Sequence, residues 1–292
     1  MESISCCNIC QSDLLLRIDP AWNLCRCGRC GFVFDSPRPT LDELIAFYSQ
    51  TGKYDSWLDD EAERDLLWKR RLRLLLPYRS QGNILDIGTG IGQFLHIARP
   101  FFTEVHGTEV SESGVRIAKE KYGLDIAQGV VEELNFHDGS FNNITLFHVL
   151  EHVPDPAGLV KTCWRLLGDQ GTLVIAVPND VLAWTSWIKK AGKLMGLPAF
   201  AKFSPVLGIS KAGTSREVHL SHFTPNVLRR LLELHGFSVT LTSIDPYYAA
   251  GGLKLAMHSV YHAFHLMLCN FCGTNRYQTI MMIARKQSLI RS

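Results

Sequence analysis

Short apolar runs alternate with amphipathic runs over most of the chain. The apolar runs have strand length, and they cover residues 83–87, 105–109, 144–149, 172–177, 237–241 and 279–284. Between them, apolar residues recur every three or four positions, which is the spacing of a helix with one buried face. Strands that alternate with helices in this way predict a three-layer α/β domain with a mostly parallel sheet.

Capping residues mark where several of these helices begin. Ser111 precedes a run that continues to Tyr122, and Asp155 with Pro156 precedes another. Thr224 with Pro225 repeats the device before a third run. Ser, Thr and Asp cap helices through their side-chain oxygens, and proline suits the first turn.

The residues before residue 81 follow a different pattern. Residues 1–36 are rich in cysteine and short of periodic apolar stretches, and prolines then mark a boundary. Residues 37–80 predict a helical linker or cap, with helices at 40–48 and 66–75. The catalytic domain is expected at 81–286. The second helix carries Lys69, Arg70, Arg71 and Arg73. We expect a solvated basic face, with contact to an anionic ligand as the alternative.

Two segments interrupt the α/β alternation. Residues 181–216 follow a strand and contain tryptophans and prolines, which is consistent with a lid over a substrate. Residues 252–271 place apolar side chains on one helical face, and we expect that face to pack on the domain. A membrane-surface helix and a dimer helix are the alternatives.

Composition argues against nucleic-acid-binding, membrane-spanning and secreted proteins. The 292 residues are 46% apolar and carry a net charge of only +2, so a nucleic-acid partner is not expected. No uninterrupted apolar run is long enough to span a membrane, and the start does not resemble a secretory signal. Nine cysteines without such a signal indicate a reducing cytoplasm, where cysteine pairs more often bind metal than form disulfides. No particular oligomeric state is predicted.

Four of the cysteines have the spacing of a metal site. Cys7 and Cys10 form one Cys-x-x-Cys pair, and Cys27 and Cys30 form a second. Two such pairs suit tetrahedral zinc with four thiolate ligands, which leaves no open position and makes the zinc structural. Free cysteines in a small fold are the alternative.

The strongest local motif reads ILDIGTGIG over residues 84–92. An apolar strand enters a glycine-rich turn that opens a helix, so the backbone can approach a ligand closely. Glu109 ends the next predicted strand, where a carboxylate can accept hydrogen bonds from ribose hydroxyls.

These residues resemble the cofactor site of class I S-adenosylmethionine-dependent methyltransferases. The resemblance continues through FNNITLFHVLEHV at 141–153 and LLGDQGTLVIAVPN at 166–179. The segment HLSHFTPNVLRRLLELHGF at 219–237 is similar to relatives of the ubiquinone-pathway O-methyltransferases. The resemblance implies a Rossmann-like fold with a seven-stranded, mostly parallel sheet, and a zinc-ribbon-like head is common in bacterial members.

The resemblance also implies which residues hold S-adenosylmethionine. They are Asp86, Gly88, Thr89, Gly90, Gly92, Glu109, Val131, Phe147 and His148. The chain departs from the family at Gly129, Val130 and Val131. Family members commonly have an acidic residue after this glycine, which contacts the adenine amine, and this chain has valine there. Adenine recognition is therefore expected from backbone groups near Val131 and Glu132.

Candidate catalytic residues follow the fourth strand and the late segment. They are His148, Glu151, His152 and His219, any of which could help to deprotonate a hydroxyl acceptor. By the resemblance, His148, Glu151 and His152 match positions that bind a divalent cation in some relatives. Glu151 and His152 could instead only fix the loop. The same string matches an inverted zinc-protease pattern, but that pattern needs a helix, and Pro154 and Pro156 oppose one.

The sequence thus predicts an S-adenosylmethionine-dependent methyltransferase that acts on a small-molecule or glycan-linked acceptor, with O-methylation favoured. Two alternatives remain open. One is an RNA methyltransferase that uses the zinc ribbon to contact RNA, and the other is a non-catalytic scaffold with a cofactor fold.

Overall fold

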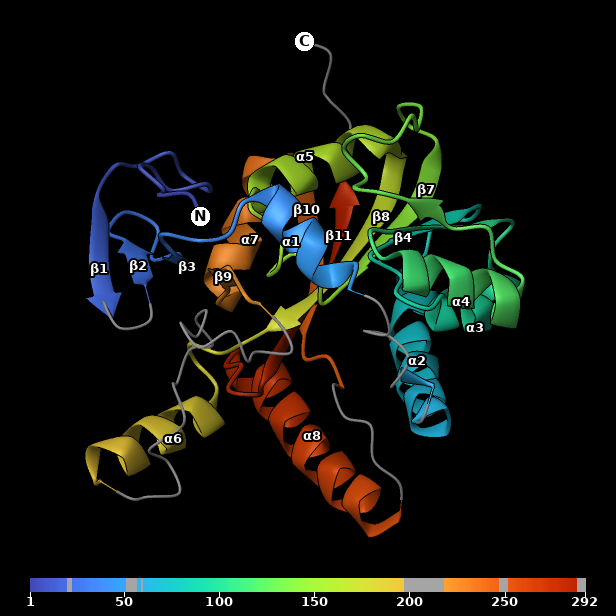
Figure 1. The fold of residues 1–292 in the computed structure, drawn as a ribbon. Helices are drawn as coiled ribbons and strands as arrows, with labels where there is room; N and C mark the ends of the chain where they lie inside the picture. Colours follow the sequence, from blue (N-terminus) through green and yellow to red (C-terminus); the bar gives the residue numbers. More distant parts are fainter. Residues whose placement is uncertain (20–22, 51–56, 59, 197–217, 247–251, 288–292) are drawn as a thin grey trace.

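A seven-stranded sheet forms the centre of the computed structural model, which describes residues 1–19, 23–50, 57–58, 60–196, 218–246 and 252–287. The strand order is β10-β11-β8-β7-β4-β5-β6 (Figure 1). The bounds are Phe237–Ser243, Thr279–Lys286, Leu167–Pro178, Phe141–Phe147, Ile84–Ile87, Val105–Glu109 and Ala127–Gln128, in that order. Within this sheet β11 runs against the other six strands. The predicted mostly parallel α/β sheet is confirmed.

Helices cover both faces of this sheet. On one face lie α2, α3 and α4, and on the other α5 and α7. Their bounds are Glu61–Leu75, Gln93–Ala98, Glu112–Tyr122, Pro156–Leu166 and Pro225–Leu234. Short 3-10 turns follow α2 and α3 at Leu76–Tyr78 and Arg99–Phe101. All four residues of β4 are buried, as expected for a strand covered on both sides.

Side-chain caps fix the helix starts that the sequence suggested. The hydroxyl of Ser111 accepts the Gly114 N–H at α4, and that of Thr224 accepts the Val227 N–H at α7. A capping box around Thr40 opens α1, which spans Leu41–Tyr48. Asp155 precedes α5 but makes no capping hydrogen bond, so Pro156 is the remaining start signal there.

The N-terminal residues form a second sheet, and its fourth strand comes from the main domain. β1 (Leu15–Asp19), β2 (Leu24–Cys27) and β3 (Val33–Asp35) pair antiparallel, and β9 (Ser221–His222) adds a fourth strand beside β3. Phe32 is fully buried, and its ring lies 5.5 Å from that of Phe223. These residues belong to the same apolar core as α5 and α7. A module too small to bury a core alone therefore shares that of its neighbour.

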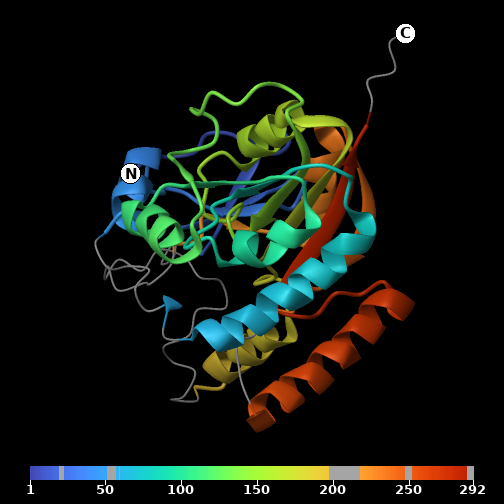
Figure 2. The same ribbon diagram turned by 90° about the vertical axis from the view of Figure 1, so that its right-hand side faces the viewer.

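Two helices, α6 (Trp184–Leu194) and α8 (Gly252–Cys272), lie below the sheet in Figures 1 and 2. The expected packing of the apolar α8 face is wrong, because Leu253, Met257 and Val260 are each at least 65% exposed. The helix packs through His265 and Cys269 instead. Of the predicted lid, α6 is described, whereas 197–216 lie outside the described residues.

Across the described parts of the chain, no helix has both the length and the apolar content to cross a bilayer.

The shared core predicts that the N-terminal sheet and the main domain unfold together. Phe32→Ala should lower the free energy of unfolding by about 3–5 kcal/mol, because truncation of a fully buried phenylalanine leaves a cavity. Denaturant titration followed by circular dichroism should show one transition at a lower midpoint. Leu16→Ala is the matched control, since that side chain is 50% exposed. An unchanged main transition in the Phe32 variant would show that the two parts are independent.

Candidate active site

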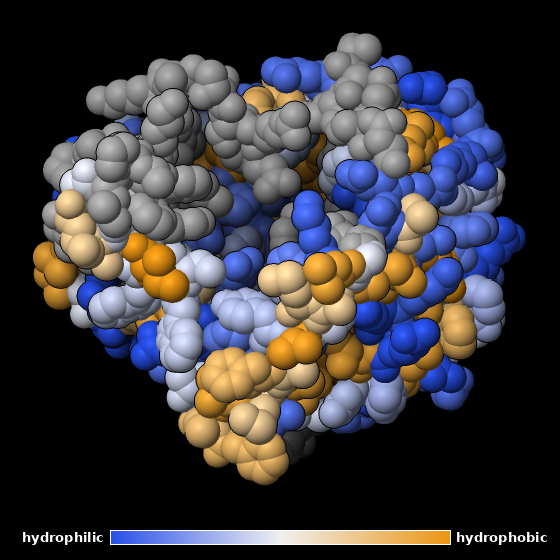
Figure 3. All heavy atoms as spheres, turned by 90° about the horizontal axis from the view of Figure 1, so that it is seen from below, coloured by the Kyte–Doolittle hydropathy of each residue, from blue (hydrophilic) through white to orange (hydrophobic). Residues whose placement is uncertain are grey.

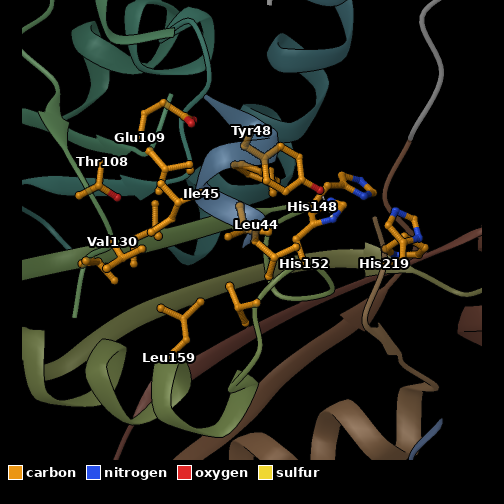
Figure 4. A pocket seen from close by; sticks show the side chains of 18 of the residues that line it. Leu44, Ile45, Tyr48, Thr108, Glu109, Val130, His148, His152, Leu159 and His219 are labelled. Atoms are coloured by element: carbon orange, nitrogen blue, oxygen red, sulfur yellow. Dashed lines mark hydrogen bonds between the residues drawn. The ribbon is translucent and has the colours of Figure 1, made fainter. Parts of the chain in front are cut away.

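A cavity of about 550 Å³ lies at the carboxyl edge of the parallel strands. That edge is where ligands bind in open α/β sheets, and the volume suits a small molecule. Leu44, Ile45 and Tyr48 of α1 cover it, and Trp57 and Trp68 add aromatic surface. Figure 4 shows Thr108 and Glu109 at one end and three histidines at the other. The cavity therefore joins an acidic end to a histidine-rich end.

The glycine turn forms the acidic end with Glu109. One Glu109 oxygen accepts the Gly90 N–H at 2.8 Å, and the other accepts the Ser111 N–H at 2.9 Å. Gly90 has φ +59°, and a side chain there would collide with the Trp57 ring, which lies 2.8 Å from the Cβ position. A larger residue at that point would push the ring away and strain the backbone.

Five of the nine residues predicted to hold the cofactor line this cavity. They are Gly88, Glu109, Val131, Phe147 and His148. Asp86 lies beneath the turn, where its carboxylate accepts the Thr145 hydroxyl at 2.6 Å. Burial raises the pKa of Asp86 to about 7, and the Thr145 hydrogen bond only partly opposes this. Thr89, Gly90 and Gly92 shape the turn from outside the cavity wall.

The backbone places the residues after β7 in an unusual conformation. His148 has φ +58°, in the left-handed region that favours glycine. Residues 148–152 form turns and no helix, so the zinc-protease arrangement is absent from this described segment. Strain of this kind at the end of a strand is often retained where it aims a side chain into a site.

Glu151, His152 and His219 meet at the histidine end. One ligand atom from each lies within 4.8 Å of the others, although His219 is far away in the sequence. Glu151 is fully buried, and one of its oxygens lies 3.3 Å from Nδ1 of His148 and 3.7 Å from Nε2 of His152. A buried carboxylate beside two imidazoles suits either proton transfer or a divalent cation.

The hydrogen bonds of His152 fix which ring nitrogen carries the proton. Its Nδ1 lies 2.7 Å from the Val218 carbonyl oxygen and 2.9 Å from the Tyr48 hydroxyl. Because a carbonyl oxygen can only accept, Nδ1 carries the hydrogen and the lone pair of the neutral ring is on Nε2. The ring is thus prepared to accept a proton or bind a metal through Nε2.

His148 links this cluster to a second charged group, because its Nδ1 lies 3.3 Å from a Glu151 oxygen. Its Nε2 lies 3.1 Å from Asp245. The Asp245 carboxylate also accepts hydrogen bonds from two nitrogens of Arg71, at 2.9 and 2.5 Å. The expectation that the basic side of α2 is solvated is wrong for Arg71, which is 2% exposed and lines the cavity. Burial would raise the pKa of Asp245, but Arg71 and His148 hold it far below its usual range.

The N-terminal sheet reaches the same edge through His222. Its Nε2 lies 3.1 Å from Asp35, and its Nδ1 lies 3.9 Å from Asp180, which in turn lies 3.5 Å from Nδ1 of His219. Burial alone would lower the pKa of His222, but the two carboxylates raise it. Asp35 and His222 therefore help to hold His219 in place through Asp180.

The four predicted zinc ligands come together in the N-terminal sheet. The Sγ atoms of Cys7 and Cys30 are 3.6 Å apart, and those of Cys10 and Cys27 are 3.5 Å apart. All four lie within 4.8 Å of one another. Burial opposes ionisation of Cys27, but the backbone amides of Cys30 and Arg29 lower its pKa to about 7. Thiolates this close together fit the radius of a zinc ion.

Sequence reasoning missed several residues of the site. Tyr48, Arg71, Asp180 and Asp245 were not expected there. Asp180 and Asp245 each follow the end of a strand that carries the predicted pattern, and polar residues at strand ends were the available signal. Tyr48 and Arg71 enter from helices that precede the sheet, and nothing local indicates their partners.

Known proteins share both the sequence pattern and the fold. An uncharacterized protein of Methanocaldococcus jannaschii is 30% identical over 46% of this chain and 62% of its own length. A ubiquinone biosynthesis O-methyltransferase of Sodalis glossinidius is 28% identical over 64% of this chain and 86% of its own. An S-adenosylmethionine-dependent methyltransferase from Archaeoglobus fulgidus superposes with a TM-score of 0.51 at 20% identity, covering 79% of this chain and 99% of that one.

The family match covers more than half of the chain. The model described as "Methyltransferase domain" matches residues 59–242, which include the glycine turn, Glu109 and the loop after β7. The sheet order and the cavity at its carboxyl edge agree with that match. The chain therefore belongs to the methyltransferase domain family and is a class I S-adenosylmethionine-dependent methyltransferase.

Proposed function

We propose that the chain methylates a hydroxyl group on a small-molecule or glycan-linked acceptor. The observation that carries this proposal is one cavity with Glu109 at one end and His152 and His219 at the other, where buried Glu151 lies within 4.8 Å of both rings. The largely apolar walls suit a compact acceptor. A screen of hydroxyl-bearing metabolites with radiolabelled S-adenosylmethionine tests it, and transfer only to RNA or to amines would contradict it.

The acidic end has the features needed to hold the cofactor. Glu109 would accept the ribose hydroxyls, and Gly88 leaves room for the methionine part. Arg64 lines the cavity, and its guanidinium lies over the Trp57 ring beside the turn, so it offers a positive charge to the methionine carboxylate. Backbone groups near Val131 would meet the adenine. When bound, S-adenosylmethionine supplies an electrophilic methyl group.

The histidine end would prepare the acceptor oxygen. Since the methyl group is already reactive, the protein mainly has to orient the nucleophile and take its proton. Nε2 of His152 is the leading acceptor for that proton, and His219 is the second. The same two rings and Glu151 could instead hold a divalent cation that lowers the pKa of the hydroxyl. His148, paired with Asp245, would line the wall between the two ends.

We further propose a structural zinc ion held by Cys7, Cys10, Cys27 and Cys30. The distances between the thiols support this assignment. A four-cysteine site is closed, so the metal would act through folding. Reduced thiols are required, which favours a cytoplasmic enzyme.

The cofactor assignment predicts a loss of affinity in Glu109→Ala. The free energy of S-adenosylmethionine binding should weaken by about 1–3 kcal/mol, because buried polar partners lose their acceptor. Titration calorimetry measures this directly. Glu104→Ala is the matched control, since that carboxylate lies just before the same strand with 69% of its side chain exposed. Equal affinity of the Glu109 variant and the wild type would remove the ribose role.

The zinc assignment predicts one zinc ion per chain in protein purified without added metal. Replacement of Cys27 and Cys30 by serine should remove the ion and lower the melting temperature, because two thiolate ligands are lost. Elemental analysis and thermal melting measure both effects. Cys272→Ser is the control, as this cysteine is exposed and outside the cluster. Zinc retained by the double variant would refute the site.

The catalytic assignment predicts that His152→Ala lowers turnover by about 10²–10⁴, the usual contribution of a general base. Cofactor affinity should change little, because the ring acts in the chemical step. Turnover, affinity and melting temperature are measured on one sample, with His106→Ala as control, since this partly exposed histidine lies outside the cavity. Unchanged turnover in a well-folded variant would exclude His152 and favour His219.

A chelator separates the two chemical routes. If a cation acts, EDTA should abolish turnover and added Mn²⁺ or Mg²⁺ should restore it in the wild type but not in His219→Ala. If His152 accepts the proton directly, the treated wild type should keep its turnover as long as the cysteine site retains zinc.

A further inference from the structure

Helices α6 and α8 present apolar side chains to solvent on one side of the molecule. We define the α6–α8 face by six exposed apolar residues, Trp187, Ile188, Leu253, Met257, Val260 and Phe264, which are 44–79% exposed. The ring of Trp184 on α6 lies 5.7 Å from that of His265 on α8, so the two helices are neighbours. Figure 3 looks onto this side and shows apolar side chains gathered there.

The apolar residues of α8 follow one stripe that the fold does not use. Leu253, Met257, Val260 and Phe264 recur at helical spacing, so they share a side of the helix. The opposite side makes the contacts with the domain, where His265 is buried and the Tyr261 ring lies 5.4 Å from that of Tyr277. The helix is already packed on the domain through its other side. A stripe of large exposed apolar residues on such a helix indicates a surface that binds a further partner.

The charge of the two helices identifies the partner. Neither α6 nor α8 contains an aspartate or glutamate, although the chain has 28 acidic residues. The α6 sequence has three lysines, at positions 189, 190 and 193, and α8 has the exposed Lys254. Apolar residues combined with cations alone complement a layer of anionic headgroups above acyl chains. The exposed Trp187 suits the same boundary, since indole rings prefer the membrane interface.

We propose that the α6–α8 face binds the surface of an anionic lipid bilayer, with the apolar stripe of α8 inserted at the level of the headgroups. Asp180 and Thr279 line the active-site cavity and lie close in sequence to the start of α6 and the end of α8. Binding would therefore bring the cavity near the lipid surface. This surface is independent of the methyl-transfer reaction, so either can fail without the other.

Vesicle sedimentation of the full-length protein tests the proposal. With equal parts of phosphatidylcholine and phosphatidylglycerol, the wild type should bind, and vesicles of phosphatidylcholine alone should bind it several-fold less. A triple variant with Met257→Ser, Val260→Ser and Phe264→Ser should bind about 100-fold more weakly, because three inserted side chains are lost. Lys254→Glu should weaken binding and reduce its salt dependence. Leu234→Ser on α7 is the matched control, since Leu234 is a 55% exposed leucine on a helix outside this face.

Two further measurements test whether the triple variant is folded and whether the wild type inserts into the bilayer. Melting curves establish that the triple variant is folded, and a blue shift of tryptophan fluorescence on addition of vesicles to the wild type reports insertion without any variant. Wild type that stays in the supernatant, or a folded triple variant that binds as tightly, overturns the proposal. It is also overturned if the wild type binds no vesicles and is a dimer that the triple variant converts to a monomer, because the face would then join two copies.

Discussion

The pairing of buried charges at the carboxyl edge of the sheet organises the active site. Arg71, His148 and Asp245 come from α2, the end of β7 and the end of β10, and all three are largely or fully shielded from water. An unpaired charge in such a place costs several kcal/mol, and removing one partner of a buried pair typically costs about 3–5 kcal/mol. The three elements must therefore meet in one arrangement, and that arrangement sets the position of the His148 ring in the cavity wall.

The same constraint joins the N-terminal sheet to the chemistry. Asp35 at the end of β3 and Asp180 after β8 flank His222, and Asp180 also faces His219. Asp35, His219 and His222 are buried, and Asp180, with 22% of its side chain exposed, lies near both histidines, so none can move without disturbing another. The pairing of β9 with β3 places His222 opposite Val33, two positions before Asp35. The cysteine module is thus part of the wall behind His219, which explains why it shares a core with the main domain.

The sequence predicted the features that depend on interactions between neighbouring residues. Strand length, helix caps and the glycine turn depend on neighbours within a few residues. Six of the seven strands of the main sheet overlap the predicted runs, and the α4 and α7 caps appear where the sequence placed them. The Cys-x-x-Cys spacing likewise predicted the cysteine cluster. Arg71 looked like part of a solvated face because its partner lies 174 positions later. The apolar stripe of α8 predicted burial, because periodicity shows that a helix has an apolar side but not what that side meets.

The segment that precedes the sheet connects these parts in one function. Tyr48 ends α1 and contacts both His152 and the backbone of Val218, so one side chain orients the ring that we propose as the proton acceptor and the segment that carries His219. Leu44 and Ile45 on the same helix cover the cavity between its two ends. Exclusion of water strengthens the electrostatic contacts of Glu109 and the histidines, and it limits hydrolysis of a reactive cofactor. A helix whose start is fixed by the Thr40 capping box can therefore act as a preformed cover that also holds the His152 ring in place, so that closure of the cavity and positioning of the base depend on the same element.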